Sequence, residues 1–497
     1  MYKVIFISLL INVLHSQNQF DVIIATGQNN ISGISHPAIE VGGSIYAFIK
    51  TDYRYSYGFP TSLVKLNKQG VIVSNNLYLD TLSPFRIFDV LKEKKEVLIC
   101  GIKILRDSGS RIIMYGELNR DMDTIWTHTI QSANNHPGVY KITRLSSQKI
   151  AMVGDDSQIS PTGGTYQKGN SAIFILTDSI GNIIKYIHFP KKDSASLEGL
   201  DYVMQSRSGD IYCVGQVQIG TLYNKGLIFK LSKDGDVIWR KDIEQFKYGY
   251  WLGYIKELTN GNILLVGSKY IPFYADNTQT WTCAIELDSS GIRKSEKIFY
   301  NNLGSNNNKC ITDNSGNIIC TGAIIHDDTT SALGYLIKLS PTGDSIWKRE
   351  FTHGWKDRDE VFTNIALGED GGYYLTGYNW AQGDNSSKAW VVKVDSNGCV
   401  VPGCNTAVNV EPEIYSEFFH TYPNPVIDLW RVYLNDELMQ NRNYLLRIYN
   451  INGQEVLKES IQGMRSEIDL KEMPSGLYIY TIQWKGRLIQ RGKLIRQ

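Results

Sequence analysis

Residues 209–243 read GDIYCVGQVQIGTLYNKGLIFKLSKDGDVIWRKDI, and variants of this stretch recur along most of the chain. The stretch contains a tight turn, an apolar strand that ends at Gly215, a variable loop and a second strand, LIFKLS. A Lys-Asp-Gly turn follows, and a third strand carries Trp239. Apolar alternation bounded by turn residues is typical of short antiparallel strands. The stretch therefore predicts most of one small β-sheet.

The turn and the strand after it form a landmark that repeats. The landmark begins near residues 43, 95, 148, 209, 261, 316 and 371, at intervals of 52 to 61 residues. A KL-type strand and an outer strand that often holds tryptophan follow it, as in IFKLSKDG and SIWKREF. Four short strands per unit at this period predict an all-β fold, a seven-bladed β-propeller. A linear stack of sheets is the alternative.

The ends of the repeat region predict how the ring closes. One antiparallel unit cannot bury both of its faces, and packing units around an axis buries them all. The seventh unit lacks a Trp-type strand, whereas residues 20–25 form a strand without earlier partners. We expect this N-terminal strand to complete the last blade. The propeller would then span residues 17–400, and the Pro- and Gly-containing segment 401–417 would be a linker.

The repeat, KL-x-x-x-G-D-x-x-W, resembles the Trp-containing repeats of secreted bacterial propellers, including the quinoprotein-like ones. The resemblance spans most of residues 20–400. The spacing differs from that of the sialidase Asp box, which places one residue between its Asp and its Gly. We therefore interpret the repeated tryptophan as a packing residue between blades and not as a ligand contact.

Composition limits the classes of function. The chain has 51 Lys and Arg against 50 Asp and Glu, so no basic excess supports nucleic-acid binding. Its 30 Tyr and 44 Gly, with few helix-forming runs, favour strands and turns. No HExxH, CxxC, GxSxG or phosphate-loop motif is present. The sequence thus predicts no metal, no cofactor and no identifiable catalytic residue.

The N-terminus reads MYKVIFISLLINVLHSQ. A lysine followed by a short apolar run is typical of a secretory signal peptide and is too short to span a membrane. We assign residues 1–16 to the signal peptide, and a buried first strand is the alternative. No other apolar run is long enough to cross a bilayer, so we expect no transmembrane segment.

The pattern changes near residue 418. Short alternating strands, an Asn-Gly turn at 452–453 and a Pro-Ser-Gly turn at 474–476 predict a small β-sandwich. Residues 418–497 resemble the type A C-terminal sorting domain of proteins exported by the type IX secretion system, known from Bacteroidetes. The motif residues are Tyr422, Pro423, Asn424, Pro425, Gly453, Gly476, Tyr478 and Lys493.

This resemblance implies partners and a destination. Its partners would be the type IX secretion machinery and a surface sortase that removes the C-terminal domain. The remainder would be secreted to the extracellular space or anchored to the outer-membrane surface. A C-terminal sandwich that serves only the propeller is the alternative.

The seven cysteines include candidates for disulfide bonds. In an exported protein, Cys399 and Cys404 in GCVVPGC are the best candidate pair. Cys310 and Cys320 flank an expected hairpin and form a second candidate pair. Cysteines at similar points of the repeat strands are interpreted as small buried core residues; these are Cys100, Cys213 and Cys320.

The connections between strands fall into two classes. Tight turns such as KDGD and PTGD would lie on one face of the propeller, and long, varied loops would lie on the other. Loops on a rigid scaffold usually carry binding, and their aromatics suit stacking on sugars or packing against a protein partner. The alternative for each aromatic is that it fills a gap between blades. The candidate binding residues are Tyr55, Tyr250, Trp251, Tyr274, Trp355 and Trp380.

The rival function is a propeller hydrolase or lyase that acts on polysaccharide. Residues 353–360, which begin with His353, form the densest ionisable cluster, but a solvated loop has the same composition. Asp155 and Asp156 resemble a calcium-binding carboxylate pair without a DxDxDG loop to support it. An enzyme should present carboxylates or a histidine at the axial ends of several inner strands, and a binding module aromatics and amides. We favour a binding role for a glycan or protein ligand.

Overall fold

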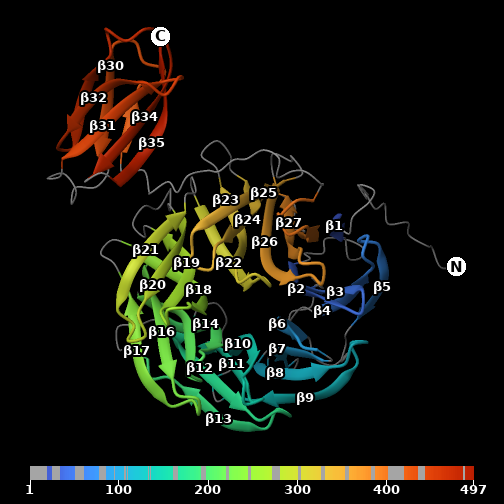
Figure 1. Ribbon diagram of the computed structural model, residues 1–497. Helices are drawn as coiled ribbons and strands as arrows, with labels where there is room; N and C mark the ends of the chain where they lie inside the picture. Colours follow the sequence, from blue (N-terminus) through green and yellow to red (C-terminus); the bar gives the residue numbers. More distant parts are fainter. Residues whose placement is uncertain are drawn as a thin grey trace. The chain divides into compact units, whose positions relative to one another are not determined.

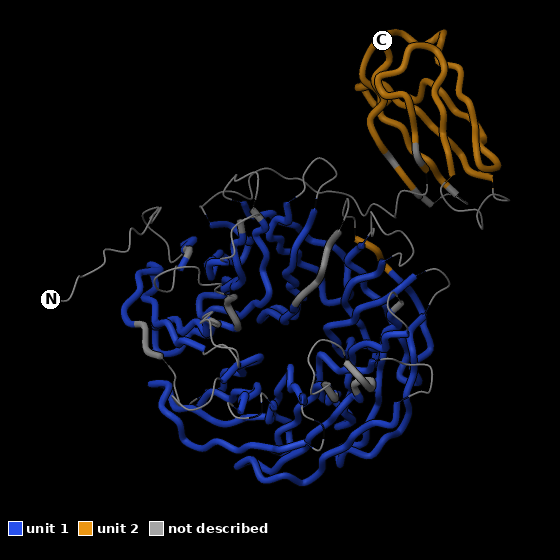
Figure 2. Tube along the Cα trace, turned by 180° about the vertical axis from the view of Figure 1, so that it is seen from behind, with its two compact units in different colours: residues 1–296, 301–410 blue, residues 297–300, 411–497 orange. Residues whose placement is uncertain are grey.

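The computed structural model spans the 497-residue chain. It describes residues 20–24, 34–50, 61–77, 85–94, 96–105, 108, 110–132, 134, 136–159, 166–191, 197–219, 223–244, 248–270, 280–299, 304–325, 331–352, 358–381, 387–400, 419–434, 443–484 and 487–497. The chain divides into two compact units, residues 1–296 with 301–410 and residues 411–497 with the segment 297–300 (Figure 2). Every regular secondary-structure element in the described residues is a β-strand.

The described part of the larger unit forms seven four-stranded sheets around a common axis (Figure 1). The first sheet holds β2 (Ile34–Val41), β3 (Ser44–Lys50), β4 (Thr61–Leu66) and β5 (Ile72–Leu77). The second holds β6 (Phe85–Lys92), β7 (Val97–Ile104), β8 (Arg111–Leu118) and β9 (Thr124–Ile130). The third holds β10 (His136–Arg144), β11 (Ile150–Ile159), β12 (Tyr166–Thr177) and β13 (Ile183–His188).

The next three sheets repeat this order, with the first strand innermost. The fourth holds β14 (Leu197–Gln205), β15 (Ile211–Ile219), β16 (Tyr223–Leu231) and β17 (Val237–Ile243). The fifth holds β18 (Gly249–Glu257), β19 (Ile263–Tyr270), β20 (Thr280–Leu287) and β21 (Arg293–Phe299). The sixth holds β22 (Gly304–Thr312), β23 (Ile318–Ile325), β24 (Ala332–Leu339) and β25 (Ser345–Phe351).

The last sheet joins the two ends of the repeat region. It holds β26 (Arg358–Leu367), β27 (Tyr373–Ala381), β28 (Ser387–Val394) and, as its outermost strand, β1 (Phe20–Ile24). β1 pairs antiparallel with β28, and the Trp390 indole N–H donates to Asp21 Oδ1 at 2.7 Å. The apolar cluster of Phe20, Ile45 and Val391 then packs this sheet against the first one.

Apolar clusters between neighbouring sheets supply the core. Phe174 and Phe229, for example, belong to the cluster shared by the third and fourth sheets, and Tyr212 and Ile285 to that of the fourth and fifth. Burying one such side chain contributes about 1.5–3 kcal/mol. Each sheet is therefore stabilised mainly by its neighbours.

The hairpin turns define one face, the turn face. In the turn before β21, the Gly291 N–H donates to the Asp288 carbonyl at 2.8 Å, and Asp288 Oδ1 accepts from the Ser290 and Ile292 N–H groups. Gly291 has a φ of +80°, which closes a type I turn with a bulge. The opposite face, which receives the longer connections, is the loop face.

The repeated tryptophans pack against these turns. A Cβ added at Gly181 or Gly398 would lie 2.6 or 2.7 Å from the ring of Trp126 or Trp347, which belongs to the preceding sheet. Because the turn residue is glycine and has no Cβ, the indole ring can pack directly on the turn backbone. The interpretation of this tryptophan as a packing residue between blades is confirmed for these positions.

The inner strands share a β-bulge. Their register shifts between Val139 and Lys141, between Leu200 and Tyr202, and at the corresponding point of the other five inner strands. The bulge presses a carbonyl against the second strand. A Cβ added to Gly154, the landmark glycine of the third sheet, would lie 1.8 Å from the carbonyl oxygen of Gly138. The landmark glycine is therefore required by a close backbone approach.

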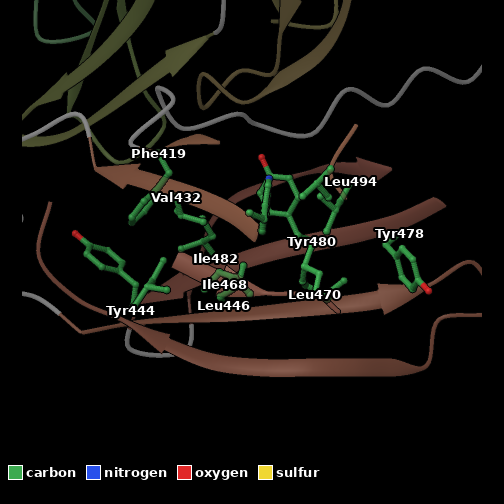
Figure 3. Packing of buried hydrophobic residues seen from close by; sticks show 14 of the residues in the cluster. Phe419, Val432, Tyr444, Leu446, Ile468, Leu470, Tyr478, Tyr480, Ile482 and Leu494 are labelled. Atoms are coloured by element: carbon green, nitrogen blue, oxygen red, sulfur yellow. The ribbon is translucent and has the colours of Figure 1, made fainter. Parts of the chain in front are cut away.

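The C-terminal unit consists of two antiparallel sheets around one core. One sheet holds β29 (Phe419–Tyr422), β30 (Leu429–Leu434) and β33 (Arg465–Asp469). The other holds β32 (Glu455–Ile461), β31 (Tyr444–Asn450), β34 (Gly476–Trp484) and β35 (Arg487–Arg496). Val432 and Ile468 from the first sheet pack with Leu446 and Ile482 from the second (Figure 3). Of the described elements, none is a helix long and apolar enough to span a membrane.

The cysteines only partly follow the expected pattern. Cys310 and Cys320 form a disulfide between directly opposed positions of β22 and β23, with a Cα–Cα distance of 4.0 Å. The second candidate pair is therefore confirmed, and the buried Cys320 belongs to the core as one half of a disulfide. Cys399 is disulfide-bonded, whereas Cys404 lies outside the described residues, so their pairing stays a prediction. The buried free cysteines of the described residues are Cys100, Cys213 and Cys283.

Candidate functional site

Polar and aromatic side chains line the axis at the bulges of the inner strands. Lys141 Nζ lies 3.0 Å from Asp89 Oδ2 and 5.0 Å from the centre of the Tyr202 ring. The Tyr202 and Tyr254 ring centres are 4.9 Å apart, and the Tyr254 hydroxyl bonds that of Thr312. These contacts run through β6, β10, β14, β18 and β22, the inner strands of the second to the sixth sheet. We call Asp89, Lys141, Tyr202, Tyr254 and Lys309 the axial belt.

Lys309 crosses the axis. Its Nζ on β22 donates to the Tyr140 carbonyl on β10 at 3.3 Å, although the two strands belong to the sixth and third sheets. Burial lowers the pKa of the Lys309 ammonium, while Asp89 and Asp201 oppose that shift. The belt therefore carries an ion pair and a buried cation at the centre of the ring.

A tyrosine–carboxyl pair lies beside the belt. The Tyr140 hydroxyl donates to Asp155 Oδ1, and a Cβ at Gly138 would lie 2.7 Å from that hydroxyl oxygen. Because Gly138 has no side chain, the Tyr140 ring can lie along the strand and reach Asp155, which is directly opposite Gly138 in the sheet. Burial raises the pKa of Asp155 to about 7, and Asp201 adds to the rise.

A second carboxyl binds an exposed tryptophan. Asp201, the bulge residue of β14, accepts a hydrogen bond from the Trp251 indole of β18. Burial raises the pKa of Asp201 to about 6. Its Oδ2 atom is buried and has no hydrogen-bond partner in the described part of the chain. Tyr140, Asp155, Asp201 and Trp251 together form what we call the axial site.

The site has the chemistry of a polar pocket beside an aromatic surface. Trp251 is 45 % exposed, so its ring can receive an apolar sugar face, while the neighbouring carboxyls can bond hydroxyls. A carboxyl with a pKa near neutrality can also exchange protons with a substrate. In the described residues, no group of three or more His, Cys, Asp or Glu is arranged to hold a metal ion.

The candidate binding residues are only partly exposed. Trp251 belongs to the axial site, and Trp380, 38 % exposed, lies near the loop-face end of β27. The expectation that Tyr250 contacts a ligand is wrong, because its side chain is fully buried and its hydroxyl donates to Glu296 at 3.0 Å. Three further candidates lie outside the described residues: Tyr55, Tyr274 and Trp355.

The two carboxylate groups considered in the sequence behave differently. His353 lies outside the described residues, and within residues 358–360 the Glu360 side chain is buried and accepts from Asn379 Nδ2 at 2.8 Å. Asp155 and Asp156 have different hydrogen-bond partners, because Asp155 accepts from the Tyr140 hydroxyl and Asp156 from the Ser132 hydroxyl. Calcium binding by the two together gains no support from this arrangement.

Sequence reasoning missed the axial carboxyl Asp201 and the cations Lys141 and Lys309. A signal was present, because two consecutive non-core residues interrupt the alternation before each landmark, as in VYKI and LDYV. In a bulge both residues of such a pair point to one side of the sheet. The turn face also holds a cavity of about 280 Å³ whose lining includes Lys68, Glu93 and Arg120, and no sequence pattern indicated it.

The C-terminal motif residues meet at one edge of their unit. Asn424 Nδ2 donates to the Lys493 carbonyl at 2.8 Å, and Asn424 Oδ1 accepts from the Ile495 N–H at 2.9 Å. The exposed Tyr422 ring stacks on Tyr433 with 5.0 Å between centres. Both prolines of the motif follow cis peptide bonds. The motif therefore attaches the first strand of the unit to the last.

The other motif residues shape turns. Gly453 has a φ of +79° and its N–H donates to the Asn450 carbonyl at 2.9 Å. Gly476 begins β34, and the buried Tyr478 donates its hydroxyl to the Pro474 carbonyl at 2.7 Å. The motif residues are spread along the sequence because they lie in different turns and strands of the unit.

Comparison with protein families assigns this unit. A model described as a secretion system C-terminal sorting domain matches residues 420–497. Residues 420–497 are a type IX sorting domain. The protein is therefore a type IX secretion substrate, extracellular or attached to the outer-membrane surface, and its sorting domain interacts with the secretion machinery.

A second family model, for the N-terminal part of the interleukin-4 receptor alpha chain, matches residues 269–355. That segment begins in β19 and ends beyond β25, so it takes part of the fifth sheet and all of the sixth and corresponds to no separate unit. No curated protein matches the chain.

Solved structures similar to the chain include three with low sequence identity. A protein of unknown function from Bacteroides caccae is 10 % identical, with 65 % of this chain and 94 % of that chain covered and a TM-score of 0.34. The propeller domain of the Trilobed protease from Pyrococcus furiosus is 10 % identical, with 75 % and 97 % covered and a TM-score of 0.41. The polysaccharide lyase Uly1 is 8 % identical, with 72 % and 89 % covered and a TM-score of 0.43.

Proposed function

We propose that this protein is an exported β-propeller that binds a glycan at the axial site, on its loop face. The observation that carries the proposal is the half-exposed Trp251, whose indole is held by the buried Asp201. An aromatic ring fixed beside hydrogen-bonding groups offers a sugar both an apolar surface and partners for its hydroxyls. A protein ligand on the same face is the alternative binding role.

We also propose the architecture in its finer form. The seven four-stranded sheets of the described residues would be the seven blades of one closed ring, with β1 completing the last blade. The two C-terminal sheets would form a β-sandwich, and residues 401–417 a linker. Residues 1–16, which lie outside the described residues, would be a signal peptide, and a surface sortase would remove the sorting domain.

The test is binding of purified protein to a panel of polysaccharides, with product analysis of the same mixtures. We expect saturable binding that falls at least about tenfold in Trp251→Ala, because a buried aromatic contact dominates such an interface. Trp380→Ala is the matched control, since Trp380 is similarly exposed but lies outside the axial site. Equal loss in both variants, or no loss in Trp251→Ala, would contradict binding at the axis.

A polysaccharide hydrolase or lyase is the second candidate, and one observation favours it. The pKa of Asp155 is raised to about 7 and that of Asp201 to about 6, so either carboxyl can be protonated near neutral pH. A general acid needs this property. New reducing ends or unsaturated products, lost in Asp155→Asn and Asp201→Asn, would establish the enzyme and replace the simple binding role.

A further inference from the structure

The inner strands differ in the side chain that they carry two positions before the bulge. Two residues before the bulge, the inner strands β6, β10, β14 and β18 present Arg86, Gly138, Gly199 and Trp251 in turn. The two glycines leave the interval between Arg86 and Trp251 without side chains of their own. A Cβ at Gly199 would lie 3.5 Å from that of Asp155, so this carboxyl borders the interval.

A second guanidinium adjoins the same place. Arg111 is the first residue of β8, at the loop-face end of the second sheet. Arg111 interacts electrostatically with Asp155 and Tyr140. His136 interacts electrostatically with both Arg86 and Arg111. Burial and the two arginines lower the pKa of His136 to about 4. His136 is therefore neutral at neutral pH, and its charged neighbours on this side are the two guanidinium groups.

The charge balance of the axial site favours an anion. Its carboxyls, Asp155 and Asp201, have raised pKa values and so lose part of their negative charge near neutrality. Arg86 and Arg111 are charged at every relevant pH, and Lys309 adds a third cation beside Asp201. The buried Asp201 Oδ2, which lacks a hydrogen-bond partner among the described residues, marks a place for a ligand hydroxyl.

We infer that the axial site takes an acidic glycan, a sugar chain that carries carboxylate or sulfate groups. Its ring lies against Trp251, a hydroxyl bonds Asp201, and its acidic group faces Arg86 and Arg111. Guanidinium groups suit both anions, because their planar N–H donors bind carboxylate and sulfate oxygens in pairs. This inference deepens the proposed glycan binding and depends on it.

The test compares matched polymers on the full chain. Polygalacturonate is measured against its carboxyl-reduced form, and dextran sulfate against dextran, by titration calorimetry. We expect one acidic polymer to bind about 10–100-fold more tightly than its neutral partner, as a charged hydrogen-bonded pair implies. A preference for polygalacturonate would identify the acidic group of the ligand as a carboxylate, and a preference for dextran sulfate would identify it as a sulfate.

Variants separate the site from general surface charge. Arg111→Gln should remove most of the preference for the acidic polymer, and Arg86→Gln should act in the same direction. Arg120→Gln is the control, because Arg120 is an arginine on the turn face that bonds the Lys94 carbonyl. Thermal unfolding checks that each variant is folded.

Each outcome decides a different claim. Equal binding of acidic and neutral polymers, lost in Trp251→Ala, would overturn the acidic ligand and leave the proposed function intact. A preference unchanged by Arg111→Gln and Arg86→Gln, or lost equally in Arg120→Gln, would also overturn the inference. Absence of binding to all four polymers would overturn the inference and count against the proposed glycan binding itself.

Discussion

The rim of the turn face and the axis of the propeller use glycine for different reasons. At the rim, Gly398 adopts a φ of +75° in a tight turn and receives the ring of Trp347. Near the axis, Gly154 lies in a strand and receives the carbonyl of a bulged neighbour strand. The rim is thus built from local turn chemistry, whereas the axis depends on a distortion shared by two strands.

This difference separates stability from function. At the rim a turn glycine lies on a tryptophan of the preceding sheet at Gly181, Gly291 and Gly398. The axis breaks the repeat, because each inner strand places different residues at the bulge. The recurring rim contacts stabilise the scaffold, and the variable positions near the bulges form the axial site.

The largest effect is expected from closing the space at the bulge. In Gly154→Ala the added Cβ would lie 1.8 Å from a backbone carbonyl oxygen, which cannot move without shifting the inner strand. We expect a loss of more than about 3 kcal/mol in the free energy of unfolding. Denaturant unfolding measures it. Gly253→Ala is the control, because a Cβ there meets nothing within 4 Å, and a similar loss in both variants would refute the steric account.

The axial carboxyls should make stability depend on pH. The folded-state pKa of Asp155, about 7, is above its ordinary value of 3.8, so between these values the folded state holds a proton that the unfolded state has released. This contribution is complete below about pH 4 and is lost as the pH rises through 7.

In Asp155→Asn the decline should be weaker. Between pH 4 and pH 8 we expect the variant to gain on the order of 3 kcal/mol relative to the wild type, measured by denaturant unfolding at each pH. Asp288→Asn serves as a comparison on the turn face, because hydrogen bonds lower the pKa of Asp288 to about 2. Parallel pH profiles for Asp155→Asn and the wild type would show that the axial carboxyl titrates as an ordinary one.

The disulfide of the sixth sheet should contribute a smaller amount. Cys310 and Cys320 are 10 residues apart, and closing a loop of that length stabilises a fold by about 2–3 kcal/mol. The double variant Cys310→Ala, Cys320→Ala should lose that much in denaturant unfolding under oxidising conditions. Cys283→Ala, which removes a buried free thiol, should lose less, and an equal loss would assign the effect to packing alone.

The smallest expected effect isolates the rim contact. Gly398→Ala and Gly371→Ala each place a side chain at a φ of +75° to +80° in the same sheet, but only Gly398 meets a tryptophan, at 2.7 Å. We expect Gly398→Ala to cost about 1–2 kcal/mol more than Gly371→Ala in the free energy of unfolding. Equal costs would mean that backbone strain, and not the Trp347 ring, explains the glycine.

Much of the architecture was predictable from the chain because its causes are local. Turn residues, alternating strands and a regular period predicted the four-stranded units, and the sorting motif predicted the domain that the family comparison assigns. The buried position of Tyr250 was not predictable in this way. An aromatic next to a loop has the same local sequence whether it faces solvent, as Trp251 does, or the neighbouring sheet.

The sequence by itself determined the all-β class, the repeating unit with its glycines and tryptophans, and the export signal, because each is visible in the chain as a short motif or a regular period. Only the tertiary structure decided which residues meet at the axis. Tyr140, Asp201 and Lys309 come from three different sheets, and their contacts arise from the bulges and from packing around the ring. No short-range sequence pattern predicts these contacts, since they join inner strands that are far apart in the chain.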